Sequence, residues 1–231
     1  MESPTLHQFS IFNAIMDGIG DHGPTAGELT ERGDHGIGTF RRMDGEMVMI
    51  DGEVYQVTAD GGVMKRTDDI ILPFAQVTRF RPVNEREIGP FNDELLRASL
   101  RDNHPSSDNL FVSVRMDGYF EEISTHIVRK QEFSGQPGIE LIKKMKHAVL
   151  RNVSGTAFGF RSPQHAGFSS PGVHMHFISS DRQIGGHIIT FKMAKGTLSS
   201  CVINNVHLEL PKSSAFNDVE LGAASSTILK S

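Results

Sequence analysis

Hydrophobic and polar positions alternate over much of this chain, a pattern that is typical of β-strands with one packed face. In the first half, Asp-Gly steps at residues 44, 51 and 60 interrupt the alternation, and each step is a strong signal for a hairpin turn. These steps predict a β-meander. A further strand is predicted for LPFAQVTRF, residues 72–80, and Pro73 favours a start at a sheet edge because proline cannot donate to a ladder.

Apolar residues recur at helical spacing in three places. The segment LHQFSIFNAIMDGI predicts an N-terminal helix that ends at Gly18, and a polar loop follows over residues 19–36. Residues 92–102 predict a short helix with Asn92 as its N-cap, and a third helix is predicted to begin after Pro137. The predicted buried stripes are Leu6, Phe9, Ile11 or Phe12, and Ile15 or Met16 in the first helix, and Ile139, Ile142, Met145 and Val149 in the third.

The second half of the chain again predicts strands. NLFVSVRMDGYFEEISTHIV, residues 109–128, predicts a hairpin with Asp117-Gly118 at its tip. GTAFGF and LSSCVINNVHLEL predict two more strands, and the small and polar last twenty residues predict a loosely held tail. Many strands with few helices indicate an α+β or mostly β protein.

Three histidines lie within the sixteen residues GVHMHFISSDRQIGGH. His174 and His176 are two apart, so in a strand they project from the same face, while Val173, Met175 and Phe177 project from the other. A turn follows, and GGHIITFKM predicts the returning strand. If the hairpin is centred between Asp181 and Arg182, His187 lies opposite His176 on the same face, so all three imidazoles converge.

Three neutral imidazoles with an open fourth position are what a catalytic zinc site requires. The alternative is that two of these histidines lie on a solvated strand face and the third packs in the turn. The convergence favours the metal site, and Gly185-Gly186 supports it because paired glycines allow the backbone to approach a neighbour closely.

The composition excludes several classes of function. The net charge is −5 and the sequence has no long basic block, so we expect no nucleic-acid partner. No apolar stretch approaches the roughly 20 residues of a membrane span, and the N-terminus lacks the basic region of a signal peptide. A single cysteine excludes an intrachain disulfide. We therefore expect a soluble cytoplasmic protein without a membrane partner.

Carboxylates are the natural acid or base partners of such a metal. Two Asp-Gly-Glu triplets end at Glu46 and Glu53. Glu53 follows a predicted turn, where carboxylates are usually solvated, and Glu46 by itself is typical of a surface strand residue. Sequence spacing does not connect Glu46 to the histidines.

Several motifs of this chain resemble the α-acetolactate decarboxylases. They are QFSIFNAIMDG, GTFRRMDGEMVMIDGEVYQV, LPFAQVTRF, KQE at 130–132, SGTAFGFRSP and, most specifically, HMHFISSDRQIGGH. The resemblance extends from Thr5 to about Leu221, almost the whole chain.

The resemblance implies a homodimeric zinc enzyme of α+β class, with an N-terminal mixed β-sheet region, a C-terminal β-barrel-like region and a few short helices. We place the approximate boundary between 1–104 and 105–231. The implied reaction converts 2-acetolactate, a small hydroxy-keto acid, to acetoin and carbon dioxide through a metal-stabilised enediolate, without an organic cofactor. Carried over by motif, His174, His176 and His187 are the zinc ligands, Glu46 is the acid or base, and Thr39 lines the pocket.

Two features depart from the family pattern. An arginine that contacts the substrate in typical members corresponds to His126 here, which is shorter and lacks the planar guanidinium. The family also brings a C-terminal glutamate into the pocket, whereas this tail reads SSTILKS and Glu220 comes too early to match. Arg161 stands where an aromatic is more usual, and it is either a compensating cation in the pocket or a surface residue at a strand end.

Three functions remain open at this point. The first is a zinc-dependent acetolactate decarboxylase. The second is a family member recruited to a different keto-acid or polyketide-like substrate, which His126 favours. The third is a metal-binding protein without catalysis, which the presence of Glu46 with all three ligands disfavours.

Overall fold

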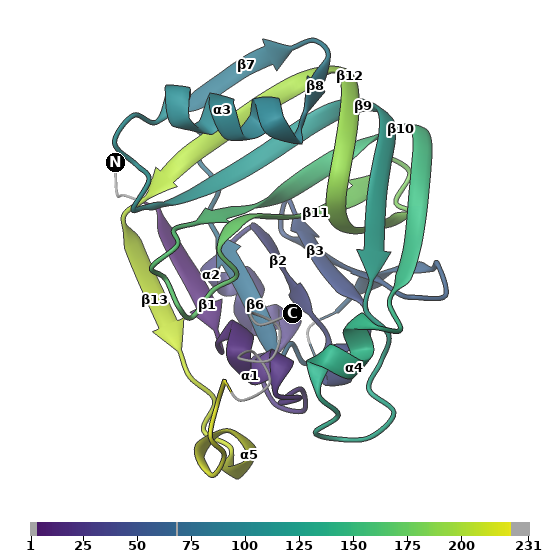
Figure 1. The fold of residues 1–231 in the computed structure, drawn as a ribbon, viewed down its shortest axis with the longest axis vertical. Coiled ribbons are helices and arrows are strands. Elements are labelled where there is room, and N and C mark those ends of the chain that lie inside the picture. Colours follow the sequence, from purple (N-terminus) through teal and green to yellow (C-terminus); the bar gives the residue numbers. More distant parts are fainter. Residues whose placement is uncertain (1–3, 68, 223–231) are drawn as a thin grey trace.

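In the computed structural model, which describes residues 4–67 and 69–222, two β-sheets are surrounded by a few short helices (Figure 1). The fold class is therefore α+β, as predicted. None of the helices in the described segments is long and apolar enough to cross a membrane.

The first sheet has seven strands in the order β13-β1-β6-β2-β3-β4-β5. Their bounds are β1 Thr5–Phe9, β2 His35–Thr39, β3 Glu46–Ile50, β4 Glu53–Val57, β5 Val63–Arg66, β6 Phe74–Thr78 and β13 Asn205–Glu209. The central strands β2, β3 and β6 are buried along their whole length. One face packs against helix α2, Ala26–Arg32, and the other against the second sheet, so both faces are apolar.

The second sheet contains long strands that close on themselves. Its strands are β7 Asn84–Ile88, β8 Phe91–Asn92, β9 Phe111–Ile127, β10 Lys146–Ser162, β11 Gly172–Ser179 and β12 Gly185–Ile203. Because β11 pairs with both β10 and β12, and β9 pairs with the same two strands, these four form a ring around an apolar core. This ring is the element that corresponds to the expected barrel-like region.

The remaining helices are short. They are α1 Phe12–Met16, the 3-10 helix η1 Arg41–Met43, α3 Asp93–Asn103, α4 Gly138–Ile142 and α5 Ser214–Asn217. In Figure 1, α1 and α4 lie near each other beneath the ring, and α3 lies beside β7 and β8.

Several local predictions are confirmed. The meander runs through β2, β3, β4 and β5, and the Asp51-Gly52 turn has both residues at positive φ, 53° and 82°, as the tightest hairpin turns require. Asn92 caps α3, its side chain accepting a hydrogen bond from the Leu95 amide at 2.9 Å. The histidine hairpin forms with the expected alternation, since Met175 and Phe177 enter the core of the ring.

The N-terminal helix prediction is wrong over its first half. Residues 5–9 form β1, which pairs with β6 and, in parallel, with the distant β13; only 12–16 are helical. The polar loop at 19–36 is also wrong in part, because Thr25 and Glu28 form a capping box that starts α2. Pro73 does precede a strand, but β6 lies inside the sheet between β1 and β2 rather than at an edge.

The hairpin predicted at Asp117-Gly118 does not exist, because β9 continues straight through it. A Cβ on Gly118 would lie 2.3 Å from the carbonyl oxygen of Lys195, so this glycine allows the close approach of β12 instead of a turn. The helix after Pro137 ends at Ile142, and Lys146 already belongs to β10. Ile142 and Val149, predicted as buried, are 39% and 49% exposed.

The division into sheets does not follow a cut between 104 and 105. β7 and β8 join the ring through β12, while β13 returns to the first sheet. The predicted tail lies partly outside the described residues, which end at 222; within the described part, α5 is helical.

Candidate metal centre

The three predicted ligands converge on the inner side of the histidine hairpin. His176 pairs directly with His187 across β11 and β12, and His174 lies two residues earlier on the same face. One ring nitrogen from each residue lies within 4.8 Å of the others. The alternative of two solvated histidines is therefore wrong, because His176 is buried and the other two are partly buried.

Burial keeps these imidazoles neutral. Loss of solvation, followed by the repulsion between neighbouring rings, lowers the pKa of His174 to about 3 and places the pKa of His176 and of His187 well below its usual range. A neutral imidazole has a free lone pair, which is the form that binds a metal.

The orientation of His176 is fixed from outside the hairpin. Its Nδ1 donates a hydrogen bond to the carbonyl oxygen of Met47 at 2.8 Å, so its Nε2 carries the lone pair. That Nε2 is buried and has no hydrogen-bond partner among the described residues. An orphaned buried acceptor aimed at two other imidazoles fits a divalent metal, since coordination would satisfy it.

Glu46 lies beside the three histidines. One carboxylate oxygen accepts a hydrogen bond from the Val128 amide at 2.9 Å, and the other lies 3.5 Å from Nε2 of His176. The side chain is buried, and burial raises the pKa of this carboxyl to about 7. Glu46 is therefore placed where a proton can be held or released near neutral pH.

Thr39 faces Glu46 directly across β2 and β3. Its hydroxyl donates to the carbonyl oxygen of Gly45 at 2.8 Å, which fixes the backbone that leads into Glu46. Thr39 also lines the cavity, the position that the family resemblance implied for it.

The histidines and Glu46 open into a cavity of about 350 Å³. Its other walls are mainly apolar and come from α1, α4, η1 and β6. They include Phe12, Ile15, Met16, Met43, Phe74, Leu141, Ile142 and Met145. No lysine or arginine is among the described residues that line it.

Gly185 and Gly186 bring the return strand close to its neighbours. A Cβ on Gly185 would lie 2.4 Å from the carbonyl oxygen of Phe177, and one on Gly186, at φ 146°, would lie 3.1 Å from Cβ of Thr125. The close approach that the sequence indicated is thus to β11 and β9, and it sets the position of His187.

His126 lines the same cavity from β9, where it pairs with His187. The two rings stack, with centroids 4.1 Å apart and planes 11° apart. Loss of solvation, with a smaller contribution from the nearby His147, lowers the pKa of His126 to about 4, so the ring is neutral at physiological pH. It does not reproduce the charge of an arginine.

Arg161 is not brought to the site. It lies one residue beyond Phe160, which pairs with His174, so its side chain leaves the opposite face of β10. Its guanidinium donates to the carbonyl oxygen and the hydroxyl of Ser107, at 2.6 and 2.9 Å, and it is absent from the cavity lining. Glu220 is exposed and does not line the cavity either.

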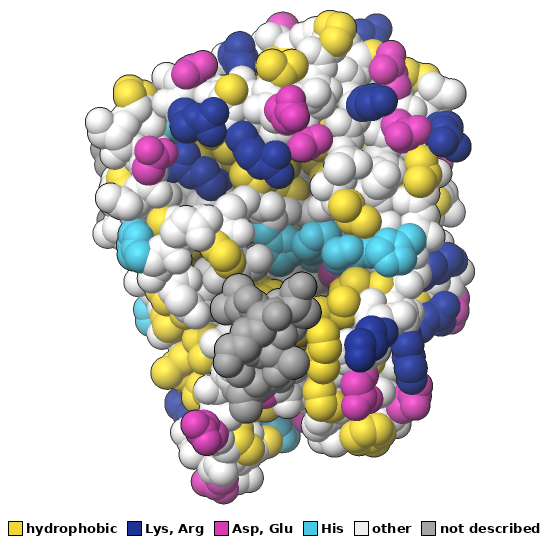
Figure 2. All heavy atoms as spheres, viewed as in Figure 1, with side chains coloured by type: hydrophobic (Ala, Val, Ile, Leu, Met, Phe, Trp, Pro, Cys, Tyr) yellow, Lys and Arg dark blue, Asp and Glu magenta, His cyan; other side chains and the backbone are white. Residues whose placement is uncertain are grey.

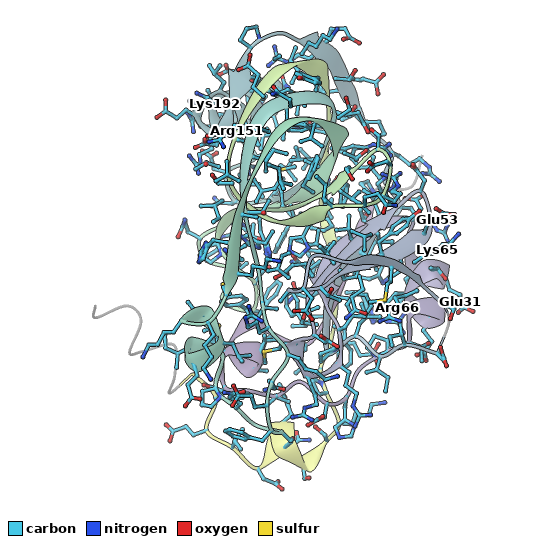
Figure 3. The ribbon with its side chains drawn as sticks, turned by 90° about the vertical axis from the view of Figure 1, so that its right-hand side faces the viewer. Glu31, Glu53, Lys65, Arg66, Arg151 and Lys192 are labelled. Carbon is cyan, nitrogen blue, oxygen red and sulfur yellow. The ribbon has the colours of Figure 1, made fainter. Side chains whose placement is uncertain are left out.

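Glu53 is a surface residue, as expected for a carboxylate next to a turn. It forms an ion pair with Lys65 at 2.6 Å, and Figure 3 shows these two side chains together at the outer side of the first sheet.

Sequence reasoning missed several parts of the site. The Met47 carbonyl and the Val128 amide carry no side-chain signal, so only the fold identifies them. His147 also lines the cavity and pairs with His126 across β9 and β10; a correct assignment of both strands would have found it. In the view of Figure 1, the space-filling picture in Figure 2 shows histidine side chains in a band across the middle of the molecule.

Comparisons with known proteins agree with this geometry. The family model of alpha-acetolactate decarboxylase matches residues 6–223. An alpha-acetolactate decarboxylase of Raoultella terrigena is 34% identical over 220 residues, covering 94% of this chain and 84% of the relative. An alpha-acetolactate decarboxylase of Methanosarcina mazei is 34% identical over 221 residues, covering 95% of this chain and 77% of the relative. The crystal structure of the Bacillus subtilis strain 168 alpha-acetolactate decarboxylase matches with a TM-score of 0.90 and 31% identity, covering 94% of this chain and 93% of that one.

Proposed function

This chain belongs to the alpha-acetolactate decarboxylase family of carboxy-lyases, and we propose that it converts 2-acetolactate to acetoin and carbon dioxide at a zinc ion. The observation that carries the proposal is the buried, unpartnered Nε2 of His176, which converges with His174 and His187 beside Glu46. The proposal includes the homodimer and the cytoplasmic location expected from the sequence.

The donor set suits the ion. Three neutral imidazoles leave a fourth position open for substrate, and the Met47 carbonyl holds His176 in the tautomer that coordinates through Nε2. Zinc bound there would supply Lewis-acid stabilisation of the negative charge that develops on the substrate oxygens.

Glu46 donates the proton that the reaction consumes. When the carboxylate leaves as carbon dioxide, its bonding electron pair stays on the substrate carbon, which must then take up one proton. A carboxyl whose pKa is about 7 holds such a proton at working pH and recovers it from solvent afterwards. The Val128 amide holds one oxygen of Glu46, so protonation comes from a fixed direction and on one face of the substrate.

The apolar walls of the cavity limit the access of water to the reaction. Apolar side chains from α1 and α4 exclude solvent around the reacting carbon, which strengthens electrostatic interactions inside the site. Thr39 helps to position Glu46. Its hydroxyl donates a hydrogen bond to the Gly45 carbonyl oxygen and so holds the backbone next to Glu46.

The apolar lining of the cavity also favours a second candidate function. Because no lysine or arginine is among the described residues that line the cavity and His126 is neutral, the cavity walls offer no cation for the carboxylate of a small acid, and their apolar side chains favour a keto-acid or polyketide-like substrate with a larger apolar substituent. This second candidate uses the same metal site and the same Glu46 but acts on a substrate other than 2-acetolactate.

The test is acetoin formation from racemic 2-acetolactate by the zinc-loaded protein. Production of acetoin supports the first candidate. His126→Arg adds a permanent cation to the cavity and should raise activity on acetolactate at neutral pH if its carboxylate binds there. Absence of acetoin from both proteins would reject acetolactate as the substrate and leave the second candidate.

A further inference from the structure

A row of four histidines crosses the four strands of the ring at one level. His147 on β10 pairs with His126 on β9, His126 pairs with His187 on β12, and His187 pairs with His176 on β11. Two members of this row, His176 and His187, belong to the candidate zinc site. The other two, His126 and His147, have no part in that ligand set.

The two halves of the row are built in the same way. His176 and His187 are opposite each other on antiparallel strands, with ring centroids 5.3 Å apart. His126 and His147 are also opposite each other on antiparallel strands, with ring centroids 6.0 Å apart. Centroid distances within the three-histidine site span 4.7 to 5.3 Å, so the rings of the second pair are less than 1 Å farther apart than the widest pair of the first site.

The second pair does not extend the first site. The ring of His126 lies parallel to that of His187, with only 11° between the planes, so its nitrogens do not converge on the same point. His126 is also outside the group of ligand atoms that lie within 4.8 Å of one another. Any ion held by His126 and His147 would therefore occupy a separate position.

The nitrogens of this pair are available. Among the described residues, neither ring makes a side-chain hydrogen bond; their contacts are the ring contacts with each other and with His187. His147 is exposed and His126 is half-buried, and both line the cavity, so the pair lies where the cavity meets solvent. The described residues that line this cavity include no lysine or arginine that would repel a cation.

We propose that His126 and His147 form a second zinc-binding site at the opening of the cavity. Two imidazoles and water complete a tetrahedral shell, with nitrogens about 2.0–2.1 Å from the ion. With two protein ligands in place of three and one of them exposed, this site binds zinc more weakly than the first. An ion there stands in the path between solvent and the inner site.

The test is zinc stoichiometry on the whole metal-free chain, measured by equilibrium dialysis over a range of free zinc. We expect about two zinc ions per chain, one tight and one weak. His147→Gln should lose the weak ion and keep the tight one. His165→Gln, an exposed histidine outside the cavity lining, is the matched control and should keep both.

A second weak ion that persists in His147→Gln would overturn the proposal, as would a wild-type chain that binds only one. Nuclear magnetic resonance of the wild-type imidazoles needs no variant. Zinc added beyond the first equivalent should shift the ring signals of His147 and His126 and leave those of His165 in place; unchanged His147 signals would reject the site. Both readouts report binding, so they stand whether or not the chain decarboxylates acetolactate.

Discussion

Replacing Glu46 by glutamine should make the metal-free protein more stable at alkaline pH. The carboxyl is buried, accepts one hydrogen bond from the Val128 amide and faces the unprotonated Nε2 of His176 at 3.5 Å. Once ionised, it forms no ion pair with a lysine or arginine in the described part of the chain that would compensate its burial. A glutamine amide can keep the hydrogen bond from Val128 through its oxygen and donate through its nitrogen to His176.

The magnitude follows from the pKa. Burial raises the pKa of Glu46 from 4.5 to about 7 in the folded protein, so the folded state holds the proton more tightly than the unfolded one. The resulting stability is fully present below the unfolded pKa and is lost as pH rises through about 7. Relative to a side chain that stays neutral, ionisation of Glu46 therefore lowers the free energy of unfolding by about 3 kcal/mol at pH 8 and by about 1 kcal/mol at pH 5. For a chain of this length, 3 kcal/mol raises Tm by about 6 to 12 °C.

The assay is differential scanning calorimetry of chelator-treated wild type and Glu46→Gln at pH 5 and pH 8. The variant should exceed the wild type in Tm at pH 8, and the difference should shrink at pH 5. Glu53→Gln is the control, because that carboxylate is on the surface, and its ion pair with Lys65 and hydrogen bond from Tyr55 lower its pKa. Equal Tm values for wild type and Glu46→Gln at pH 8 would mean that the ionised carboxylate does not destabilise the folded state.

Four further outcomes are expected. His176→Ala should abolish stoichiometric zinc, measured by elemental analysis, and full zinc content would reject the ligand assignment. Zinc-loaded Glu46→Gln should lose turnover by about a hundredfold or more, since an amide cannot exchange the proton; unchanged turnover would return Glu46 to a structural role. Asn92→Ala should lower the free energy of unfolding by about 1 kcal/mol through loss of the cap on α3, measured by urea denaturation, with an unchanged midpoint as the contrary result. Gly118→Ala should cost about 1–3 kcal/mol in the same assay, because its Cβ would lie 2.3 Å from the Lys195 carbonyl; a neutral effect would mean that β12 can move away.

Predictions succeeded where the determining interactions are local in sequence. The cap of α3 joins Asn92 to an amide three residues later, and the Asp51-Gly52 turn is set by its own two residues. The pairing of His176 with His187 follows from one short turn, which fixes the register of both strands.

Predictions failed where a distant segment decided the conformation. Residues 5–9 carry apolar positions compatible with a helix, but β6 and β13 offer them backbone hydrogen bonds on both sides, and a strand results. Asp117-Gly118 has the composition of a turn, yet the approach of β12 uses the missing side chain of Gly118 to continue the strand. Neither partner segment is visible in a local pattern.

The candidate site likewise contains residues whose positions depend on local geometry and residues whose positions depend on distant segments. The shared face of His174, His176 and His187 could be predicted from the sequence alone, because strand geometry and a single turn place them there. The folded chain was needed to show that Glu46 joins them, that Arg161 does not, and that His126 is stacked and neutral. Those outcomes depend on packing the first sheet against the ring, which removes water from Glu46 and the imidazoles and so sets their protonation.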